Sequence, residues 1–263
     1  MKIYIYGIID FNDNLNNSIK GLGDRYVYNI SYQDIGVVVS NLPEQVLGKI
    51  DSDYVIEHEK VLESLMEGFS VLPMRFLTVF DTKENLISMV RYYYNDFKNN
   101  LDRLYGKVEL GVKVIWPGES IRENIINLYA GNSQKIRISG NSQAMDYVTD
   151  KFQEYKTDKA FEEEANSRIK DIDRFFNNFV VEKRLEKLKS QNLLLNASYL
   201  VEKEKQEDFK EAFEHLRNVP GNFKYLLSGP WPPYNFVLLS KKSHTFNNLD
   251  KTDIFDRILN TKT

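Results

Sequence analysis

The chain has 263 residues, of which 42% are hydrophobic and 13% aromatic, and its formal net charge is −3. This length allows one large domain or two smaller ones, and we expect two. The negative charge argues against nucleic acid as the main ligand, because phosphate binding needs a local excess of cations. The absence of cysteine excludes disulfides, thiolate nucleophiles and cysteine-ligated metals, and fits a cytoplasmic protein. The apolar runs are too short for a signal peptide or a membrane-spanning helix.

Residues 1–106 are predicted to form an α+β domain. Runs of β-branched and aromatic residues indicate strands, and apolar residues at helical spacing indicate helices. The expected elements are strands at 3–9, 26–32, 35–40 and 71–80, a loop or short helix at 12–23, and helices at 53–69 and 84–105. Gln33-Asp34 is compatible with a tight hairpin. This order predicts an antiparallel sheet with helices on one face, similar to a modified ferredoxin-like fold.

Residues 107–263 are predicted to form a second α+β domain with a long helical insertion. The expected elements are strands at 108–116, 193–201, 223–227 and 235–239, a helical hairpin at about 119–190, and a helix at 204–217. Weak breaks in the helical stretch are expected near Gly131 and Gly140. The residues from Lys241 onward are predicted to be a loose polar tail, with one helical turn at 254–259.

An apolar stripe runs along the second half of the helical stretch. It comprises Ala165, Ile169, Ile172, Phe176 and Phe179, and continues in shifted phase through Val181, Leu185 and Leu188. The spacing is that of a coiled-coil seam with a stutter, but it is too short for a true coiled coil. We therefore expect a hairpin packed on itself or on a sheet, with the charged residues forming a solvated helix face.

The segment 228–236 reads SGPWPPYNF and holds three of the seven prolines and one of the two tryptophans. Because proline fixes φ and removes a backbone donor, this segment should form a stiff, extended corner. Two interpretations stay open. Trp231 and Tyr234 could clamp the segment onto its own sheet, or they could be an aromatic hot spot for a partner protein.

Motifs of common enzyme chemistry are absent from the sequence: there is no GxxxxGK[ST], GxGxxG, HExxH or GxSxG. The best polar candidates are His58 and Arg75. His58, flanked by Glu57 and Glu59, could be a general base, or a buried imidazole satisfied by a local partner. Arg75, in the predicted strand 71–80, could bind an anion or pair with a carboxylate such as Glu109.

Four segments together resemble the gas vesicle accessory family GvpL/GvpF. They are VLPMRF at 71–76, GKVELGVKV at 106–114, LLNASYLV at 194–201 and SGPWPPYNF at 228–236. The N-terminal YIYGI at 4–8 and the helix that carries His58 also fit. The resemblance covers almost the whole chain, and GPWPPYNF is its most specific part. One departure is Leu77, where the family pattern is expected to have glycine.

The resemblance implies a non-enzymatic protein without a cofactor, built from an N-terminal modified ferredoxin-like domain and a C-terminal α+β domain with extra helices. It implies a role in the structure or assembly of gas vesicles, with contacts to the hydrophobic shell protein GvpA and to other accessory proteins. It does not distinguish an F-type from an L-type member. The candidate partner-binding or family-motif residues are His58, Pro73, Arg75, Phe76, Glu109, Gly229, Pro230, Trp231, Pro233, Tyr234 and Phe236.

The leading hypothesis is therefore a cytoplasmic protein associated with the gas vesicle that binds other proteins and binds neither nucleic acid nor a membrane. The alternative is a small-molecule enzyme that uses His58 and Arg75 on a ferredoxin-like sheet. It requires these groups to converge in one open pocket. RNA binding ranks last, because no segment resembles the aromatic RNA-binding motifs of such sheets.

Overall fold

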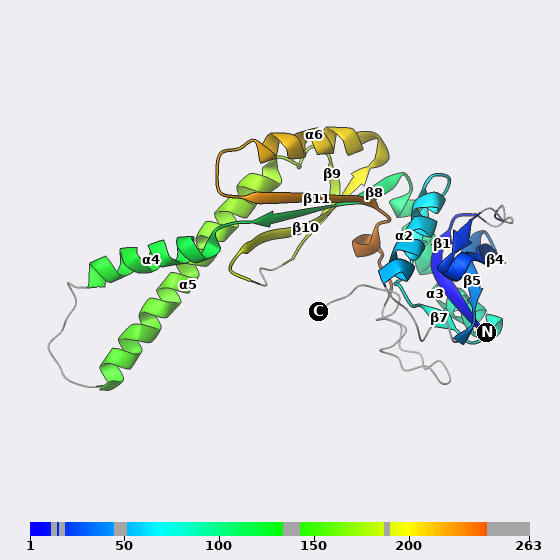
Figure 1. The fold of residues 1–263 in the computed structure, drawn as a ribbon, viewed down its shortest axis with the longest axis horizontal. Helices are drawn as coiled ribbons and strands as arrows, with labels where there is room; N and C mark the ends of the chain where they lie inside the picture. The colour runs from blue at the N-terminus through cyan, green and yellow to red at the C-terminus, as the bar shows by residue number, and fades with distance from the viewer. Residues whose placement is uncertain (12–14, 16–18, 45–51, 134–142, 187–189, 241–263) are drawn as a thin grey trace. The chain divides into compact units, whose positions relative to one another are not determined.

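The computed structural model describes all residues except 12–14, 16–18, 45–51, 134–142, 187–189 and 241–263 (Figure 1). The chain forms two compact units. The first unit comprises Met1–Glu109 and Pro230–Thr263, and the second comprises Leu110–Gly229. The predicted domains, 1–106 and 107–263, place residues 230–240 in the C-terminal domain, whereas their contacts group them with the N-terminal residues.

The first unit is built around an antiparallel sheet. Its strands are β1 (Lys2–Ile9), β4 (Tyr28–Tyr32), β5 (Ile35–Leu42), β6 (Val71–Pro73) and β7 (Val79–Phe80). The order is β4-β5-β1-β6, and β7 also pairs with β1. A smaller ladder joins β2 (Lys20–Gly21) to β3 (Arg25–Tyr26). The predicted hairpin is confirmed: Tyr32 pairs with Ile35, and Gln33 takes the positive φ of 52° that so tight a turn demands.

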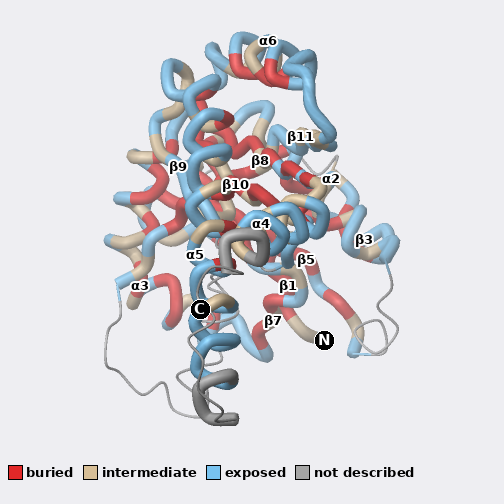
Figure 2. Tube along the Cα trace, turned by 90° about the vertical axis from the view of Figure 1, so that its left-hand side faces the viewer, coloured by how far each residue is buried: buried red, intermediate tan, exposed pale blue. Residues whose placement is uncertain are grey.

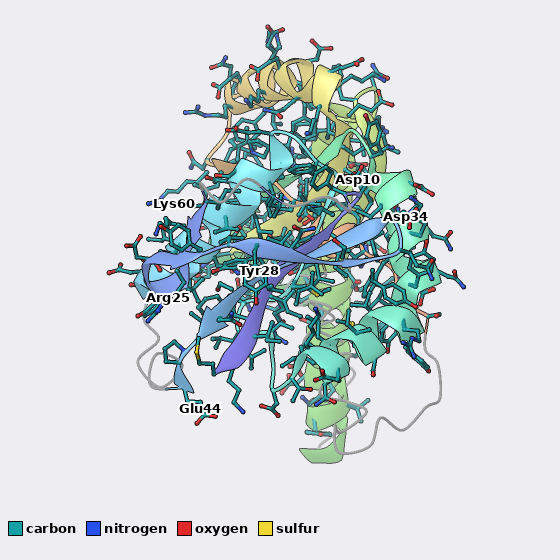
Figure 3. All side chains as sticks on the ribbon, turned by 90° about the vertical axis from the view of Figure 1, so that its right-hand side faces the viewer. Asp10, Arg25, Tyr28, Asp34, Glu44 and Lys60 are labelled. Carbon is teal, nitrogen blue, oxygen red and sulfur yellow. The ribbon has the colours of Figure 1, made fainter. Side chains whose placement is uncertain are left out.

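Two helices cover this sheet, α2 (Ser52–Met66) and α3 (Lys83–Leu104). The apolar side of α2 packs with Tyr4 and Tyr6 of β1, whereas the buried side of α3 contributes nothing to that cluster. Figure 3 shows α2 and α3 on opposite faces of the sheet. The prediction of helices on one face is therefore wrong for this unit. The physical reason is visible in β1, whose residues from 3 to 9 are all buried, as in a strand covered on both sides.

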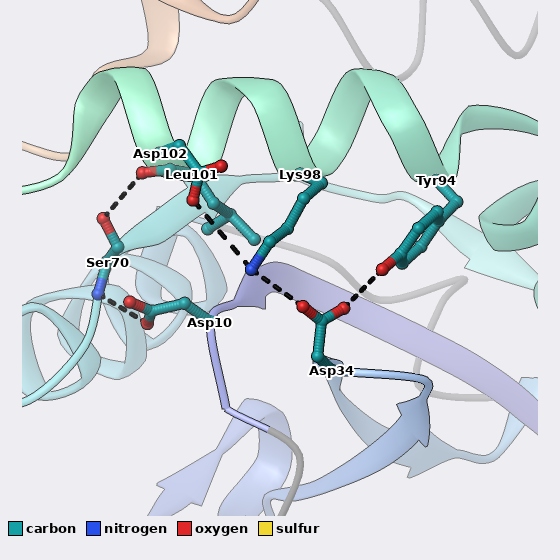
Figure 4. Close-up of polar contacts among 7 residues, drawn as sticks. All are labelled: Asp10, Asp34, Ser70, Tyr94, Lys98, Leu101 and Asp102. Atoms are coloured by element: carbon teal, nitrogen blue, oxygen red, sulfur yellow. Dashed lines mark hydrogen bonds and ion pairs between the residues drawn. The ribbon is translucent and has the colours of Figure 1, made fainter.

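Polar contacts tie one end of the sheet to α3 and to the loop before β6 (Figure 4). In the β4–β5 turn, the Asp34 carboxylate accepts a hydrogen bond from the Tyr94 hydroxyl at 2.5 Å and pairs with the Lys98 ammonium at 2.8 Å. Lys98 holds the pKa of Asp34 below its usual value. At the end of β1, the Asp10 carboxylate accepts from the backbone N–H of Ser70 at 3.0 Å. These contacts hold the strand ends in place, so the apolar faces stay aligned.

The second unit holds a sheet with the order β11-β8-β10-β9. Its strands are β8 (Lys107–Ile115), β9 (Val180–Glu186), β10 (Leu193–Glu202) and β11 (Lys224–Trp231), and its helices are α4 (Gly118–Ser133), α5 (Gln143–Arg174) and α6 (Gln206–Arg217). Contacts between α4 and α5 confirm the predicted helical hairpin. The buried residues of this unit lie mainly on β8 and β10, whereas most of α5 is exposed (Figure 2). The apolar stripe of α5 joins this core through Ala165 and Ile172, and Phe176 stacks on Phe209 at 4.5 Å between ring centroids.

The helical prediction fails beyond α5. Residues 180–186 form β9, an edge strand paired antiparallel with β10, and not a shifted continuation of the helix. Val181 and Leu185, expected on the helical stripe, are exposed on this strand, and Leu188 lies outside the described residues. The charged residues between them suit a solvated sheet edge. The break expected at Gly131 is also wrong, because α4 runs through that position. The break expected at Gly140 and the polar tail lie outside the described residues.

The predicted strand 235–239 is wrong as well. Tyr234–Phe236 forms a short 3-10 turn, η3, and the residues that follow it up to Ser240 form no strand. β11 instead extends further than predicted and includes Pro230. Proline is tolerated there because β11 is the edge strand of its sheet. The stiff corner was expected over residues 228–236, here called the Pro-Trp segment. It is reduced to the residues that follow Trp231.

Candidate functional site: an aromatic pocket in the first unit

A tight turn separates β6 from β7 and places Arg75. The Thr78 backbone N–H donates to the Arg75 carbonyl at 3.1 Å, and the Thr78 hydroxyl donates to the same oxygen at 2.6 Å. The predicted continuous strand 71–80 is therefore wrong in its middle. Arg75 lies at an exposed turn, not on a strand face beside Leu77 and Val79.

Leu77 occupies the third position of this turn with a φ of 71°. Glycine is favoured in this conformation, since a Cβ crowds the backbone there at a cost of about 1–2 kcal/mol. Position 77 is also the position at which the family pattern is expected to have glycine. The departure in sequence therefore coincides with a strained residue, while the turn itself is kept.

His58 on α2 is fully buried among aromatic side chains. Its Nδ1 lies 2.8 Å from the Tyr4 hydroxyl, and its Nε2 lies 3.4 Å from the Tyr234 hydroxyl. The imidazole stacks on Tyr6, with 5.5 Å between the ring centroids, and meets the Phe76 ring edge-on. Burial lowers the pKa of His58 to about 4, so the imidazole is neutral near pH 7. Of the two interpretations of His58, this geometry favours the buried imidazole satisfied by local partners.

Glu59, the next residue on α2, is tied to the same tyrosine. The Tyr234 hydroxyl donates to Glu59 Oε1 at 2.9 Å. Because its proton goes to Glu59, the Tyr234 hydroxyl oxygen is left as an acceptor beside Nε2 of His58. Glu59 Oε2 is buried and has no hydrogen-bond partner among the described residues. Burial accordingly raises the pKa of Glu59, and burial together with the Glu59 charge raises the pKa of Tyr234.

Glu109 anchors the segment that follows the prolines. Its side chain in β8 is buried, Oε2 accepts from the backbone N–H of Asn235 at 2.8 Å, and Oε1 accepts from the Asn235 side-chain amide. Further along, the Leu238 backbone N–H donates to the Asn100 side chain of α3 at 2.9 Å. Phe236, between these bonds, is fully buried. The segment from Tyr234 to Leu238 is thus fixed within the first unit by contacts to Glu59, Glu109 and Asn100, and the Tyr234 hydroxyl bonds to α2 and not to its own sheet.

These elements surround a pocket of about 470 Å³, here called the aromatic pocket. Its lining residues are Glu59, Arg75, Phe76, Glu109, Trp231, Tyr234 and Asn235. Three aromatic rings, two carboxylates and one guanidinium thus meet, drawn from α2, the β6–β7 turn, β8 and the Pro-Trp segment. The pocket combines apolar walls with a carboxylate that lacks a complete set of hydrogen bonds, and this combination is suited to binding a ligand.

The structure brings five of the predicted residues together in the lining: Arg75, Phe76, Glu109, Trp231 and Tyr234. His58 lies beside them beneath Tyr234. Of the others, Pro73, Pro233 and Phe236 are buried, whereas Gly229 and Pro230 are exposed. Gly229 has a φ of 100°, which explains the need for glycine there.

Glu59 and Asn235 also line the pocket, although neither is among the candidate site residues predicted from the sequence. Asn235 lies inside the PPYNF motif, and this motif could have identified Asn235 as a candidate from the sequence. Glu59 was noted only as a neighbour of His58, and no sequence pattern distinguishes it from the other carboxylates of α2.

The geometry gives little support to the alternative enzyme hypothesis. Among the described residues, the pocket lining includes Arg75 and leaves out His58. Both imidazole nitrogens lie near tyrosine hydroxyls, and the imidazole is not aimed at an open site. Within the same part of the chain, no group of three or more His, Asp or Glu side chains could hold a metal ion. None of the described helices is long and apolar enough to cross a membrane.

The fold defines a class of α+β proteins of two units with antiparallel sheets. In this class, as the pocket shows it, Tyr234 of the Pro-Trp segment is hydrogen-bonded beside the buried His58. The model of the family "Gas vesicle synthesis protein GvpL/GvpF" matches residues 2–238. The chain therefore belongs to the GvpL/GvpF family, and the resemblance stated from the motifs is confirmed.

Relatives and solved structures agree with this assignment. Gas vesicle protein F1 of Halobacterium salinarum is 28% identical over 246 residues, which cover 90% of this chain and 92% of that protein. The crystal structure of GvpF from Microcystis aeruginosa superposes with a TM-score of 0.78 at 21% identity, over 90% of this chain and 99% of that one. A second crystal structure, GvpF from Anabaena, gives a TM-score of 0.68 at 21% identity, over 91% of this chain and 99% of that one. At this identity the structures support the fold alone.

Proposed function

We propose that this protein is a non-enzymatic assembly protein of gas vesicles, which binds the hydrophobic shell protein GvpA and other accessory proteins during vesicle nucleation and growth. It would act in the cytoplasm, associated with the growing vesicle. The observation that carries the proposal is the family match over residues 2–238. The rigid aromatic pocket adds a surface on which a partner could be held.

The physical need for such a protein is clear. A shell subunit with a gas-facing apolar surface exposes segments that aggregate before they assemble. A partner protein can cover them by strand addition or by holding a side chain in a preformed pocket. Edge strands are present in both units, and the half-buried Trp231 is the kind of residue that anchors interfaces. A specific complex of this kind would bury on the order of 1,600 Å².

The test is co-purification of the tagged protein with the shell subunit from cells that form vesicles, together with deletion of the gene. We expect association, and loss or malformation of vesicles in the deletion strain. Trp231→Ala should weaken the association, whereas Leu226→Ala, which removes an exposed side chain from β11 outside the pocket, should not. Normal vesicles in the deletion strain, together with no association, would refute the proposal.

A further inference from the structure

We propose that the aromatic pocket binds the side chain of a lysine on a partner protein, with Glu59 as the carboxylate that recognises the ammonium group. This inference rests on the proposed function only in assuming that the ligand belongs to a protein. It goes further by naming the chemistry that the pocket selects, and the residues that select it.

The Glu59 carboxylate has an incomplete set of hydrogen bonds. Oε1 accepts from Tyr234, whereas Oε2 is buried without a partner in the described part of the chain. A buried acceptor left unsatisfied costs about 1–3 kcal/mol, and more when it is charged. A ligand that brings a donor recovers this loss. Glu59 lines the pocket, so a donor held there lies beside this carboxylate.

The wall of the pocket is largely aromatic. The rings of Phe76, Trp231 and Tyr234 line it, and aromatic rings attract an ammonium group while packing against an alkyl chain. The volume of about 470 Å³ is enough for a lysine side chain together with its own backbone. The alkyl chain of lysine therefore suits the aromatic wall, and its ammonium group suits the Glu59 carboxylate.

The charge of the pocket lining also favours a cationic ligand. The lining carries two carboxylates, Glu59 and Glu109, against one guanidinium, Arg75, so its formal charge is negative and disfavours an anionic ligand. Both oxygens of Glu109 already accept from Asn235, whereas Oε2 of Glu59 accepts no hydrogen bond among the described residues, so Glu59 has the greater capacity for a new donor. An arginine ligand fits less well, because its planar fork binds best to both oxygens of a carboxylate and Tyr234 occupies one of them.

Intrinsic fluorescence can test this in the intact protein, because the chain has only two tryptophans. Trp231 lines the pocket, whereas Trp116 is 2% exposed in the core of the second unit, where its indole N–H donates to the Gln191 carbonyl. The probe is acetyl-lysine N-methylamide. Matched probes carry norleucine, arginine or glutamate in place of lysine. We expect a saturable change of Trp231 emission with the lysine probe, at about tenfold higher affinity than with norleucine.

Two variants sharpen the test. Glu59→Gln keeps the shape of the side chain and removes its charge, and should lower lysine affinity about tenfold, to the level of norleucine. Glu67→Gln removes a charge from an exposed position just after the same helix, outside the pocket lining, and should leave affinity within about twofold of the wild type. Circular dichroism should show the same folded signal for both variants before binding is compared.

The inference is overturned if lysine binds no better than norleucine, if the arginine or glutamate probe binds more tightly, if Glu59→Gln binds as the wild type does, or if no probe gives a saturable signal. The assay contains neither shell protein nor vesicles. A positive lysine result with no association between this protein and the shell subunit would count against the proposed function alone.

Discussion

The buried His58 should make the stability of this protein depend on pH in a defined window. The pKa of His58 is about 4 in the folded chain, against an ordinary value of 6.5 for histidine. Between pH 4 and pH 6.5 the histidine is therefore protonated in the unfolded chain and neutral in the folded chain. The contribution of the neutral imidazole to folding stability is fully present above pH 6.5. It is lost as pH falls from 6.5 to about 4.

The size of the effect follows from the shift. Each pKa unit corresponds to about 1.4 kcal/mol, so this group should remove about 2 kcal/mol of unfolding free energy between pH 7.5 and pH 5.0, and about 3 kcal/mol once pH falls below 4. Glu59 acts in the opposite direction, because its raised pKa favours the folded state at low pH. The His58 contribution must therefore be measured as a difference between two proteins that share Glu59.

The assay is urea unfolding of the wild type and of His58→Asn at pH 7.5 and pH 5.0, followed by circular dichroism. The asparagine side chain keeps a polar group near Tyr4 but does not titrate. We expect the wild type to lose about 2 kcal/mol more than the variant between the two pH values. His215 and His244 are present in both proteins, so their effects cancel. Equal pH dependence in the two proteins would refute the reasoning that burial keeps this imidazole neutral.

Three further predictions concern strain, anchoring and packing. Leu77→Gly should raise the unfolding free energy by about 0.5–1 kcal/mol, because relief of the positive φ outweighs the greater chain entropy of glycine, and a thermal melt should show a higher midpoint. Glu109→Gln should cost about 2 kcal/mol, because an amide cannot accept both bonds from Asn235, and limited proteolysis should then cut the C-terminal segment sooner. Phe176→Ala should cost about 4 kcal/mol in chemical denaturation, whereas Phe152→Ala, at a residue that is 53% exposed, should change stability by less than about 0.5 kcal/mol.

Elements with a strong local signal were predictable from the sequence. The apolar spacing of 84–105 matches α3 within one residue at each end, and the hairpin at Gln33-Asp34 is in place. In both cases the pattern is long, or is closed by a turn with few conformations. Local chemistry and tertiary packing then favour the same structure.

Elements that depend on distant partners were not predictable. Residues 180–186 carry apolar positions that fit a helix as well as an edge strand, and only pairing with β10 decides between them. Residues 235–239 look like a strand, but Glu109, 126 positions away in sequence, binds Asn235 and imposes a turn. The strand expected at 71–80 is broken by a turn in which a leucine takes the φ of a glycine.

The candidate site shows the same division. The motifs VLPMRF and GPWPPYNF pointed to Arg75, Phe76, Trp231 and Tyr234, which do line one pocket. Their meeting with Glu59 could not be read from the sequence, because it depends on the C-terminal segment returning to α2 through Tyr234. The incomplete hydrogen bonding of Glu59, on which the lysine inference rests, is a property of the folded chain alone.

The central claim is that this protein works by holding other proteins at the aromatic pocket. A photo-crosslinking amino acid placed at exposed position 75, on the pocket lining, tests it most directly in cells that form vesicles, with position 105 in the same unit, 68% exposed, as the control. Mass spectrometry should identify the shell protein or another gas vesicle protein joined at 75, through a peptide that contains lysine, and should find far less of it at 105. Normal vesicles formed with no such crosslink at 75, or with equal crosslinking at both positions, would contradict the account.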